Sequence, residues 1–202
     1  MQTYTDYLKN QQYGSGANLN ARIRIHQQYS TNKLGLPRWI FSQMQLSPEA
    51  EILEVGCGTG NQWLRILELI PPGWQLILTD FSAGILAEAE QNRAGKLPNG
   101  RVQGADAQQL PFPEHSFDAI VANHMLYHIP DRPKAFQEFQ RVLRPGGKLY
   151  AATNGKHHMT ALYAWADRFG LDTASLAAAA FRVGSFSLEN GAEQLEPFFD
   201  DV

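Results

Sequence analysis

Short apolar runs alternate with amphipathic segments along the middle of this chain of 202 residues. Five runs are short, apolar and bounded by Gly, Pro or Asp, which is typical of buried parallel strands. They are EILEV (51–55), WQLILT (74–79), GRVQGA (100–105), FDAIVAN (117–123) and GKLYAAT (147–153). The segments 61–70, 82–94 and 132–143 between them place apolar residues three and four apart, which is the helical spacing. This alternation predicts an α/β fold with a mostly parallel sheet, helices on both faces and right-handed crossovers.

Helical patterns also flank this alternating core. Five further helices are predicted, and they span 18–30, 36–45, 157–169, 173–181 and 192–199. An irregular stretch, 182–191, separates the last two. We expect one domain. Its parts are an N-terminal helical lid (1–46), a cofactor-binding core (47–153) and a C-terminal helical part (154–202).

Composition narrows the class of protein. The formal net charge is -3, so we expect no basic face for a nucleic acid backbone. No apolar run approaches the roughly 18 residues that span a bilayer, and the first residues lack the pattern of a secretory signal. Cys57 is the only cysteine, which excludes an intrachain disulfide and fits a reducing compartment. We therefore expect a cytoplasmic protein that binds neither nucleic acid nor membrane.

A glycine-rich turn follows the first predicted strand. Gly56, Gly58 and Gly60 would allow a tight turn and let a ligand lie against the backbone, because a Cβ atom would hold it off. In sheets of this kind ligands bind beyond the carboxyl ends of the strands. The dinucleotide fingerprint G-x-G-x-x-G is not matched, since Asn61 stands where its last glycine would be. A nicotinamide or flavin dinucleotide is therefore disfavoured.

Several motifs together carry a resemblance to a known family. EVGCGTG, LTDFS, GADAQQLPFPEHSFDAIVANHMLYHIPD and RVLRPGGKL follow one another from about Ile52 to Thr153. In order and spacing they resemble the class I methyltransferases that use S-adenosylmethionine (SAM), in particular the small-molecule, type 11 branch. The resemblance implies a Rossmann-like, doubly wound fold. It also implies methyl transfer to a small-molecule acceptor, with S-adenosylhomocysteine as the product.

The same resemblance implies roles for individual residues. The glycine turn would lie under the methionine part of SAM, with Glu54 near its amino group and Asn123 at the end of the fourth strand. Asp80 would accept hydrogen bonds from the ribose hydroxyls. This agrees with its own chemistry, because a carboxylate about 20 residues beyond such a turn is placed for a ribose diol. The predicted adenine contacts are Phe81, Asp106 and the backbone of Ala107. Asp106 has a second interpretation, as a cap of its own turn.

Candidates near the transferred methyl group follow the fourth strand. His124 and His128 could each act as a base toward a hydroxyl or amine, although the histidine of YHIPD also has a packing interpretation. Tyr127 is a substrate-side candidate. In the predicted lid the substrate-side candidates are Tyr13, Arg22 and His26. Methyl transfer from a sulfonium requires no catalytic residue, because the electrophile is already activated.

Other classes of site and function were weighed. The chain has no Cys/His cluster with zinc spacing and no carboxylate group suited to magnesium, so we predict no metal. Two alternatives to a small-molecule enzyme stay open. One is a non-catalytic SAM-binding partner of another methyltransferase, and the other is a methyltransferase that acts on a macromolecule. The motifs do not specify the acceptor or the atom that is methylated.

The end of the chain carries one more expectation. Sheets of the resembled family usually have seven strands, and NGAEQLEPFFDDV resembles the helix before the last two. We therefore expect five parallel strands, with KLYAAT left at an edge whose unpaired N–H and C=O groups favour sticking. Either residues 182–188 fold back as a makeshift strand along this edge, or a second copy of the chain covers it as a homodimer.

Overall fold

One parallel sheet organises the molecule. The computed structural model describes residues 15–171 and 184–202. Its five strands have the order β3-β2-β1-β4-β5, with every neighbouring pair parallel. The strands are β1 (Glu51–Val55), β2 (Gln75–Asp80), β3 (Gly100–Gly104), β4 (Phe117–Asn123) and β5 (Leu143–Ala152). This confirms the predicted α/β class. The winding reverses between β1 and β4, which is where ligands bind in such sheets.

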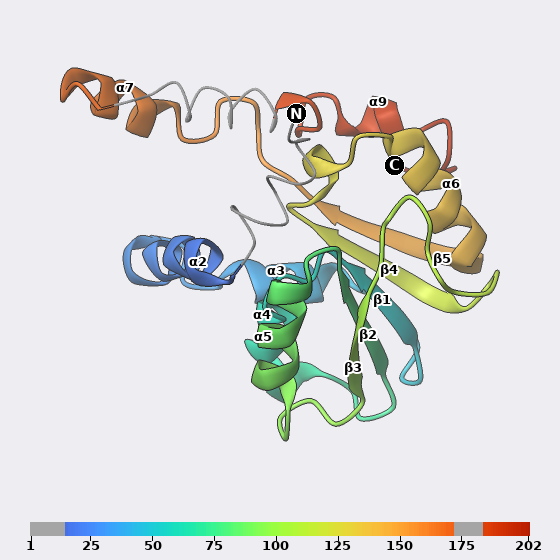
Figure 1. Ribbon diagram of the computed structural model, residues 1–202. Coiled ribbons are helices and arrows are strands. Elements are labelled where there is room, and N and C mark those ends of the chain that lie inside the picture. The colour runs from blue at the N-terminus through green and yellow to red at the C-terminus, as the bar shows by residue number, and fades with distance from the viewer. Residues whose placement is uncertain (1–14, 172–183) are drawn as a thin grey trace.

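Helices lie on both faces of the sheet. They are α2 (Ala17–Tyr29), α3 (Leu36–Gln43), α4 (Asn61–Leu64), α5 (Ala83–Arg93), α6 (Arg132–Val142), α7 (Thr160–Arg168) and α9 (Gly191–Leu195). Figure 1 shows α3, α4 and α5 on one face, α6 and α9 on the other, and α7 standing away from the sheet. None of the helices in the described part of the chain is long and apolar enough to cross a membrane.

The core consists of two apolar clusters separated by the sheet. Successive side chains of a strand point to opposite faces. In β4, Ile120 and Ala122 pack with the α6 residues Phe136 and Phe139. Val121, between them in sequence, packs on the other face with Trp63, Trp74 and the α5 residue Ala89. The central strands are therefore buried on both sides, as their nearly continuous apolar runs predicted.

Two predicted helices end well before their patterns do. The segment 61–70 divides into α4 and the 3-10 helix η2 (Leu67–Leu69), because the chain turns to bury both Trp63 and Ile66. In such a short segment tertiary packing overrides apolar spacing. The predicted helix 192–199 ends at Leu195, since Pro197 has no N–H with which to continue it. The predicted helix 173–181 lies outside the described residues.

The fifth strand begins earlier than expected. Its predicted start was Gly147, after a helix-breaking turn, but the paired strand begins at Leu143. The extra residues form a bulge, with a register shift opposite Phe117 to Ala119 and a positive φ of 78° at Gly146. Arg144 Nη1 donates to Asp118 Oδ2 at 2.6 Å, and the same oxygen accepts from the backbone N–H of Glu51 at 2.8 Å. These bonds join β1, β4 and β5 at their amino ends.

The makeshift strand predicted over 182–188 is not found in its described part, residues 184–188. Asn190 closes this segment into a turn, because its Oδ1 accepts from the N–H of Ser187 and its Nδ2 donates to the carbonyl of Gly184. Phe186 packs in the apolar cluster on the α6 face. The hydrogen bonds of the segment to the chain after β5 lie beyond the carboxyl end of that strand, where Thr153 Oγ1 donates to the carbonyl of Phe186 and Leu188 N–H donates to the carbonyl of Asn154. In the described residues β5 therefore pairs only with β4.

Candidate functional site

The glycine turn begins directly after β1, at the carboxyl edge of the sheet. Gly56 and Gly58 have φ values of 70° and 55°, which L side chains rarely adopt. Each is also closely approached. A Cβ on Gly56 would lie 2.8 Å from Met125 Cβ, and a Cβ on Gly58 would lie 2.7 Å from Leu19 Cδ2. Gly60, also left-handed, is the N-cap residue of α4. The turn therefore needs glycine for its backbone shape as well as for close approach.

Asp80 ties the end of β2 to this turn. Its Oδ2 accepts from the N–H of Gly58 at 3.0 Å, and its Oδ1 accepts from the N–H of Ser82 at 2.9 Å. Burial raises the pKa of Asp80, and the backbone N–H donors of Ser82 and Gly58 act against that rise. A carboxylate has about four accepting positions. Asp80 therefore keeps capacity for the hydroxyl groups of a ligand.

Glu54 lies in the interior, one residue before the end of β1. Its side chain is 2% exposed, and its Oε2 accepts from the indole Nε1 of Trp63 at 2.8 Å. Burial raises the pKa of Glu54 to about 8; the Trp63 hydrogen bond opposes this and the charge of Asp80 adds to it. The Cys57 thiol on the turn is also buried, and burial raises its pKa well above 9.0. The carboxyl group of Glu54 and the thiol of Cys57 therefore keep their protons beside the glycine turn.

The end of β4 carries two polar atoms without a partner in the described residues. They are Oδ1 of Asn123 and Nδ1 of His124, both fully buried atoms. The amide nitrogen of Asn123 lies 3.5 Å from Oε1 of Gln62. His124 has a positive φ of 55°, and its N–H donates to the carbonyl of Ala152 in β5 at 2.8 Å. Both residues lie at the switch point between β1 and β4.

The predicted adenine contacts lie farther along the same edge. Asp106 Oδ1 accepts from the N–H of Gln108 at 2.9 Å and from its Nε2 at 3.1 Å, so Asp106 does cap its own turn. Gln108 Oε1 in turn accepts from the N–H of Asp131. Ala107 is buried in the cluster on the α6 face. Phe81 follows the end of β2 and is 41% exposed.

The substrate-side candidates lie on different elements. Arg22 and His26 are exposed on α2, whereas Tyr13 lies outside the described residues. Tyr127 and His128 belong to the 3-10 helix η3 (Leu126–His128), with their rings 4.6 Å apart edge to face. His26 is close enough to His124 to lower its pKa, so α2 does bring one candidate to the end of β4.

Sequence reasoning missed three contributors to this region. His158 is exposed in the turn before α7 and carries no motif signal, yet it lowers the pKa of His124 more than His26 does. Trp63 was treated as an apolar helix position, although its indole N–H holds Glu54. Glu88 of α5 accepts from the N–H of Gly16 and from Nδ2 of Asn20, and so attaches α2 to the core. Periodicity carries no signal for any of these long-range pairs.

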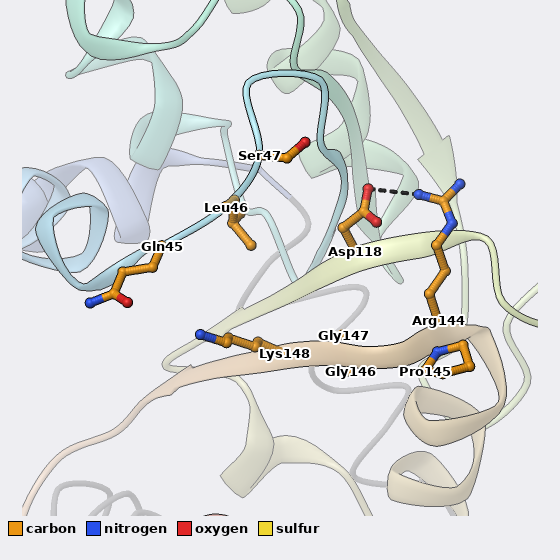
Figure 2. Close-up of a pocket in the computed structure, with 9 residues that line it drawn as sticks. All are labelled: Gln45, Leu46, Ser47, Asp118, Arg144, Pro145, Gly146, Gly147 and Lys148. Atoms are coloured by element: carbon orange, nitrogen blue, oxygen red, sulfur yellow. Dashed lines mark hydrogen bonds and ion pairs between the residues drawn. The ribbon is translucent and has the colours of Figure 1, made fainter.

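Two hollows lie at the opposite edge of the sheet. Figure 2 shows one of about 160 Å³, between the segment Gln45–Ser47, the Asp118–Arg144 ion pair and the bulge of β5. The other, about 420 Å³, lies at the amino ends of β1, β2 and β3. The acidic groups, the glycine turn and the unpartnered atoms lie at the carboxyl edge, so we place the candidate site there.

Comparison with known proteins identifies the core of the chain. Residues 53–151, about half of the chain, match the family described as "Methyltransferase domain". Residues 53–151 therefore form a domain of this methyltransferase family. The matched range contains the glycine turn, Asp80 and the end of β4. Among the described residues of the chain, no group of three or more His, Cys, Asp or Glu side chains is arranged to hold a metal ion.

The methyltransferase domain has relatives of several kinds. Ubiquinone/menaquinone biosynthesis C-methyltransferase UbiE of Hahella chejuensis is 34% identical over 50% of this chain and 41% of its own length. Demethylmenaquinone methyltransferase of Lactiplantibacillus plantarum is 35% identical over 54% of this chain and 46% of its own. The solved [4+2]-cyclase SpnF matches with a TM-score of 0.52 and 30% identity, over 56% of this chain and 42% of that protein. The matched part of this chain thus spans less than half the length of each relative.

Proposed function

We propose that this chain is a SAM-dependent methyltransferase that acts on a small-molecule acceptor. The observation that carries the proposal is the convergence at the switch point between β1 and β4. A left-handed glycine turn, the Asp80 carboxylate bound to that turn and the unpartnered Oδ1 of Asn123 meet there. The relatives named as methyltransferases of ubiquinone and menaquinone synthesis support a small-molecule acceptor.

The residues present suit the proposed cofactor. Asp80 would accept from the ribose hydroxyls, because its carboxylate keeps accepting capacity beside Gly58 and Ser82. Oδ1 of Asn123 is an acceptor that requires a donor, and an ammonium group supplies one. Phe81 offers an exposed ring for the adenine. When bound, SAM supplies an activated methyl group. The protein supplies orientation and a site from which water is excluded.

Calorimetry with SAM and S-adenosylhomocysteine tests the cofactor assignment. We expect both to bind, and Asp80→Asn to weaken binding by about 1.5 to 3 kcal/mol, since a strong acceptor becomes partly a donor. Asp118→Asn is the matched control, because it breaks an ion pair at the other edge of the sheet and should leave affinity unchanged. Folded protein that gives no heat with either compound would contradict the assignment.

A second candidate function is that of a SAM-binding protein that does not transfer the methyl group, and one observation favours it. The relative SpnF is described as a cyclase, so a domain of this kind occurs in a protein named for a different reaction. Methyl-labelled SAM, incubated with the chain and fractionated metabolite pools, separates the two functions. We expect label in a small metabolite. Binding of SAM without any transfer of label would favour the second candidate, and label only in protein or RNA would favour a macromolecular acceptor.

A further inference from the structure

Two hydrogen-bonding atoms are left without partners at adjacent positions of the carboxyl end of β4. Oδ1 of Asn123 can only accept, and Nδ1 of a neutral histidine accepts in one of its two tautomers. An unsatisfied buried polar atom costs roughly 1–3 kcal/mol. Asn123 Oδ1 is assigned above to the methyl donor. His124 Nδ1 is a second atom, on the next residue, and the proposed cofactor does not account for it.

The position of His124 is imposed by the sheet. Its φ of 55° lies in the left-handed region, which costs a residue with a Cβ atom of order 1–3 kcal/mol. The backbone is held there by the hydrogen bond from its N–H to the Ala152 carbonyl of β5. The hydrogen bond therefore holds the backbone of His124 in place at the edge where the ligand is proposed to bind. Backbone strain of this kind is concentrated at functional sites.

The surroundings of the ring determine which ligand group suits it. The titratable groups that act on His124 in the described structure are two other histidines, His158 before α7 and His26 on α2. Burial, followed by His158 and His26, lowers the pKa of His124 below 6.5, so the ring is neutral at pH 7. Because no carboxylate acts on it, a cationic acceptor would find no counter-charge. A neutral hydroxyl group would give Nδ1 the donor that it lacks.

We propose that His124 binds the methyl acceptor through an acidic hydroxyl group, of the phenol or enol class, which donates its hydrogen to Nδ1. This inference rests on the proposed function for the methyl donor. In the reaction the hydroxyl proton passes to Nδ1 and its bonding pair stays on the acceptor. A pair on that oxygen, or on the carbon conjugated with it, then forms the bond to the methyl carbon. The sulfonium sulfur keeps the pair of the bond that breaks, and the imidazolium returns its proton to water.

The NMR resonances of isotopically labelled histidine rings test whether a hydroxyl group donates to His124. The probes are phenol and 2-naphthol, with their methyl ethers anisole and 2-methoxynaphthalene as matched controls, added to protein saturated with S-adenosylhomocysteine. We expect both hydroxyl compounds to shift the His124 resonances and to bind about tenfold or more tightly than their ethers, which have no hydrogen to donate. Equal shifts with hydroxyl compounds and ethers, or no shift with any probe, would overturn the proposal.

Two variants separate the role of His124 from its structural position. His124→Gly keeps a residue that tolerates a positive φ but has no side-chain acceptor, and should weaken phenol binding about tenfold while S-adenosylhomocysteine affinity stays. His157→Gly, next to His158 and exposed, is the matched control and should change neither affinity. Unchanged phenol binding in His124→Gly would contradict the inference. The resonances of the wild-type chain decide the question even where the variant folds poorly.

The pH dependence gives an independent measurement. The ring accepts only when neutral, so phenol binding should weaken as the pH falls through the pKa of His124, below 6.5. His158→Asn removes a neighbour that lowers this pKa, so the midpoint should move to higher pH. Phenol binding that stays constant while the His124 resonances report protonation of the ring would contradict the inference. If S-adenosylhomocysteine fails to bind, the proposed function fails, while phenol titration of the ligand-free chain still tests His124.

Discussion

The carboxyl group of Glu54 combines deep burial with a single strong hydrogen bond from Trp63. Its pKa in the folded chain is about 8, against about 4.5 for an unperturbed group, so the folded state binds a proton that the unfolded state releases. The contribution of Glu54 protonation to the free energy of unfolding is therefore fully present below about pH 4.5, and it is lost as the pH rises toward 8. The loss approaches about 1.4 kcal/mol for each pH unit within that window.

Glu54→Gln should remove this part of the pH dependence, because the amide oxygen still accepts from Trp63 and has no proton to lose. Denaturant unfolding at pH 5, 6, 7 and 8 gives the free energy of unfolding of each protein, and the difference between the wild type and the variant at each pH measures the contribution of Glu54. Glu51→Gln, at the less buried start of β1, is the control and should follow the wild type. Parallel stability curves for wild type and Glu54→Gln would show that Glu54 ionises as freely in the folded chain as in the unfolded one.

Individual site residues were predictable from the sequence only where a motif fixes the local backbone. The glycine turn and Asp80 are of this kind, since they follow strands that the apolar pattern identifies, and the structure joins them by the bond from Gly58 to Asp80. The bond between Trp63 and Glu54 was not predictable. It depends on how α4 packs over the sheet, and an indole at an apolar helical position carries no sign of its partner.

At the scale of elements, Glu88 of α5 holds the start of α2 with two hydrogen bonds. Glu88 of α5 accepts from Asn20 Nδ2 at 2.6 Å and from the N–H of Gly16, the N-cap residue of α2, at 3.0 Å. Gly16 has no side chain with which to cap the helix, so the carboxylate serves both the free N–H and the positive end of the helix dipole. Asn20 and Gly16 lie 68 and 72 residues from Glu88 in sequence, so the sequence pattern of the predicted lid did not indicate this contact.

Glu88→Ala should let α2 detach without unfolding the sheet. Hydrogen bonds to a charged acceptor contribute roughly 1.5–3 kcal/mol at most, and less where they are exposed to solvent. Losing them lowers the free energy of opening of α2, so amide hydrogen exchange in α2 should quicken about tenfold. Exchange in β1 and β4 should stay as slow as in the wild type. Glu90→Ala provides the comparison, because Glu90 pairs with Arg93 on α5 itself. Equal exchange of α2 in both variants would mean that Glu88 does not hold the helix.

At the scale of the whole molecule, five parallel strands were predictable because buried parallel strands are apolar on both faces. The start of β5 was not, since the sequence around Pro145 favours a turn and the bulge becomes a strand only by pairing with β4. The course of residues 184–188 was also unpredictable, because Asn190 closes that segment into a turn. In the described residues β5 is the outermost strand next to β4, as predicted, and no other strand pairs with it.

This edge predicts self-association of the chain. The carbonyl of Ala152 faces β4, where it accepts from His124, so the backbone groups of its neighbour Ala151 face outward. An outward row of unpaired donors and acceptors favours pairing with another strand. Ala151→Pro should reduce self-association in sedimentation runs at rising concentration, since it removes one outward N–H. Ala151→Ser keeps that N–H and should associate like the wild type. A wild-type chain that stays monomeric at all concentrations would contradict this prediction.

The single thiol of the chain lies inside the glycine turn, and its position has a kinetic consequence. Cys57 is 7% exposed, its N–H donates to the carbonyl of Thr79 at 2.8 Å, and its raised pKa keeps thiolate scarce. A thiol reagent can therefore modify it only during moments when the turn opens. The rate of labelling counts those openings at one position, with no substitution needed and no other cysteine to confuse the signal. A ligand that rests on the turn should slow that rate in proportion to its occupancy.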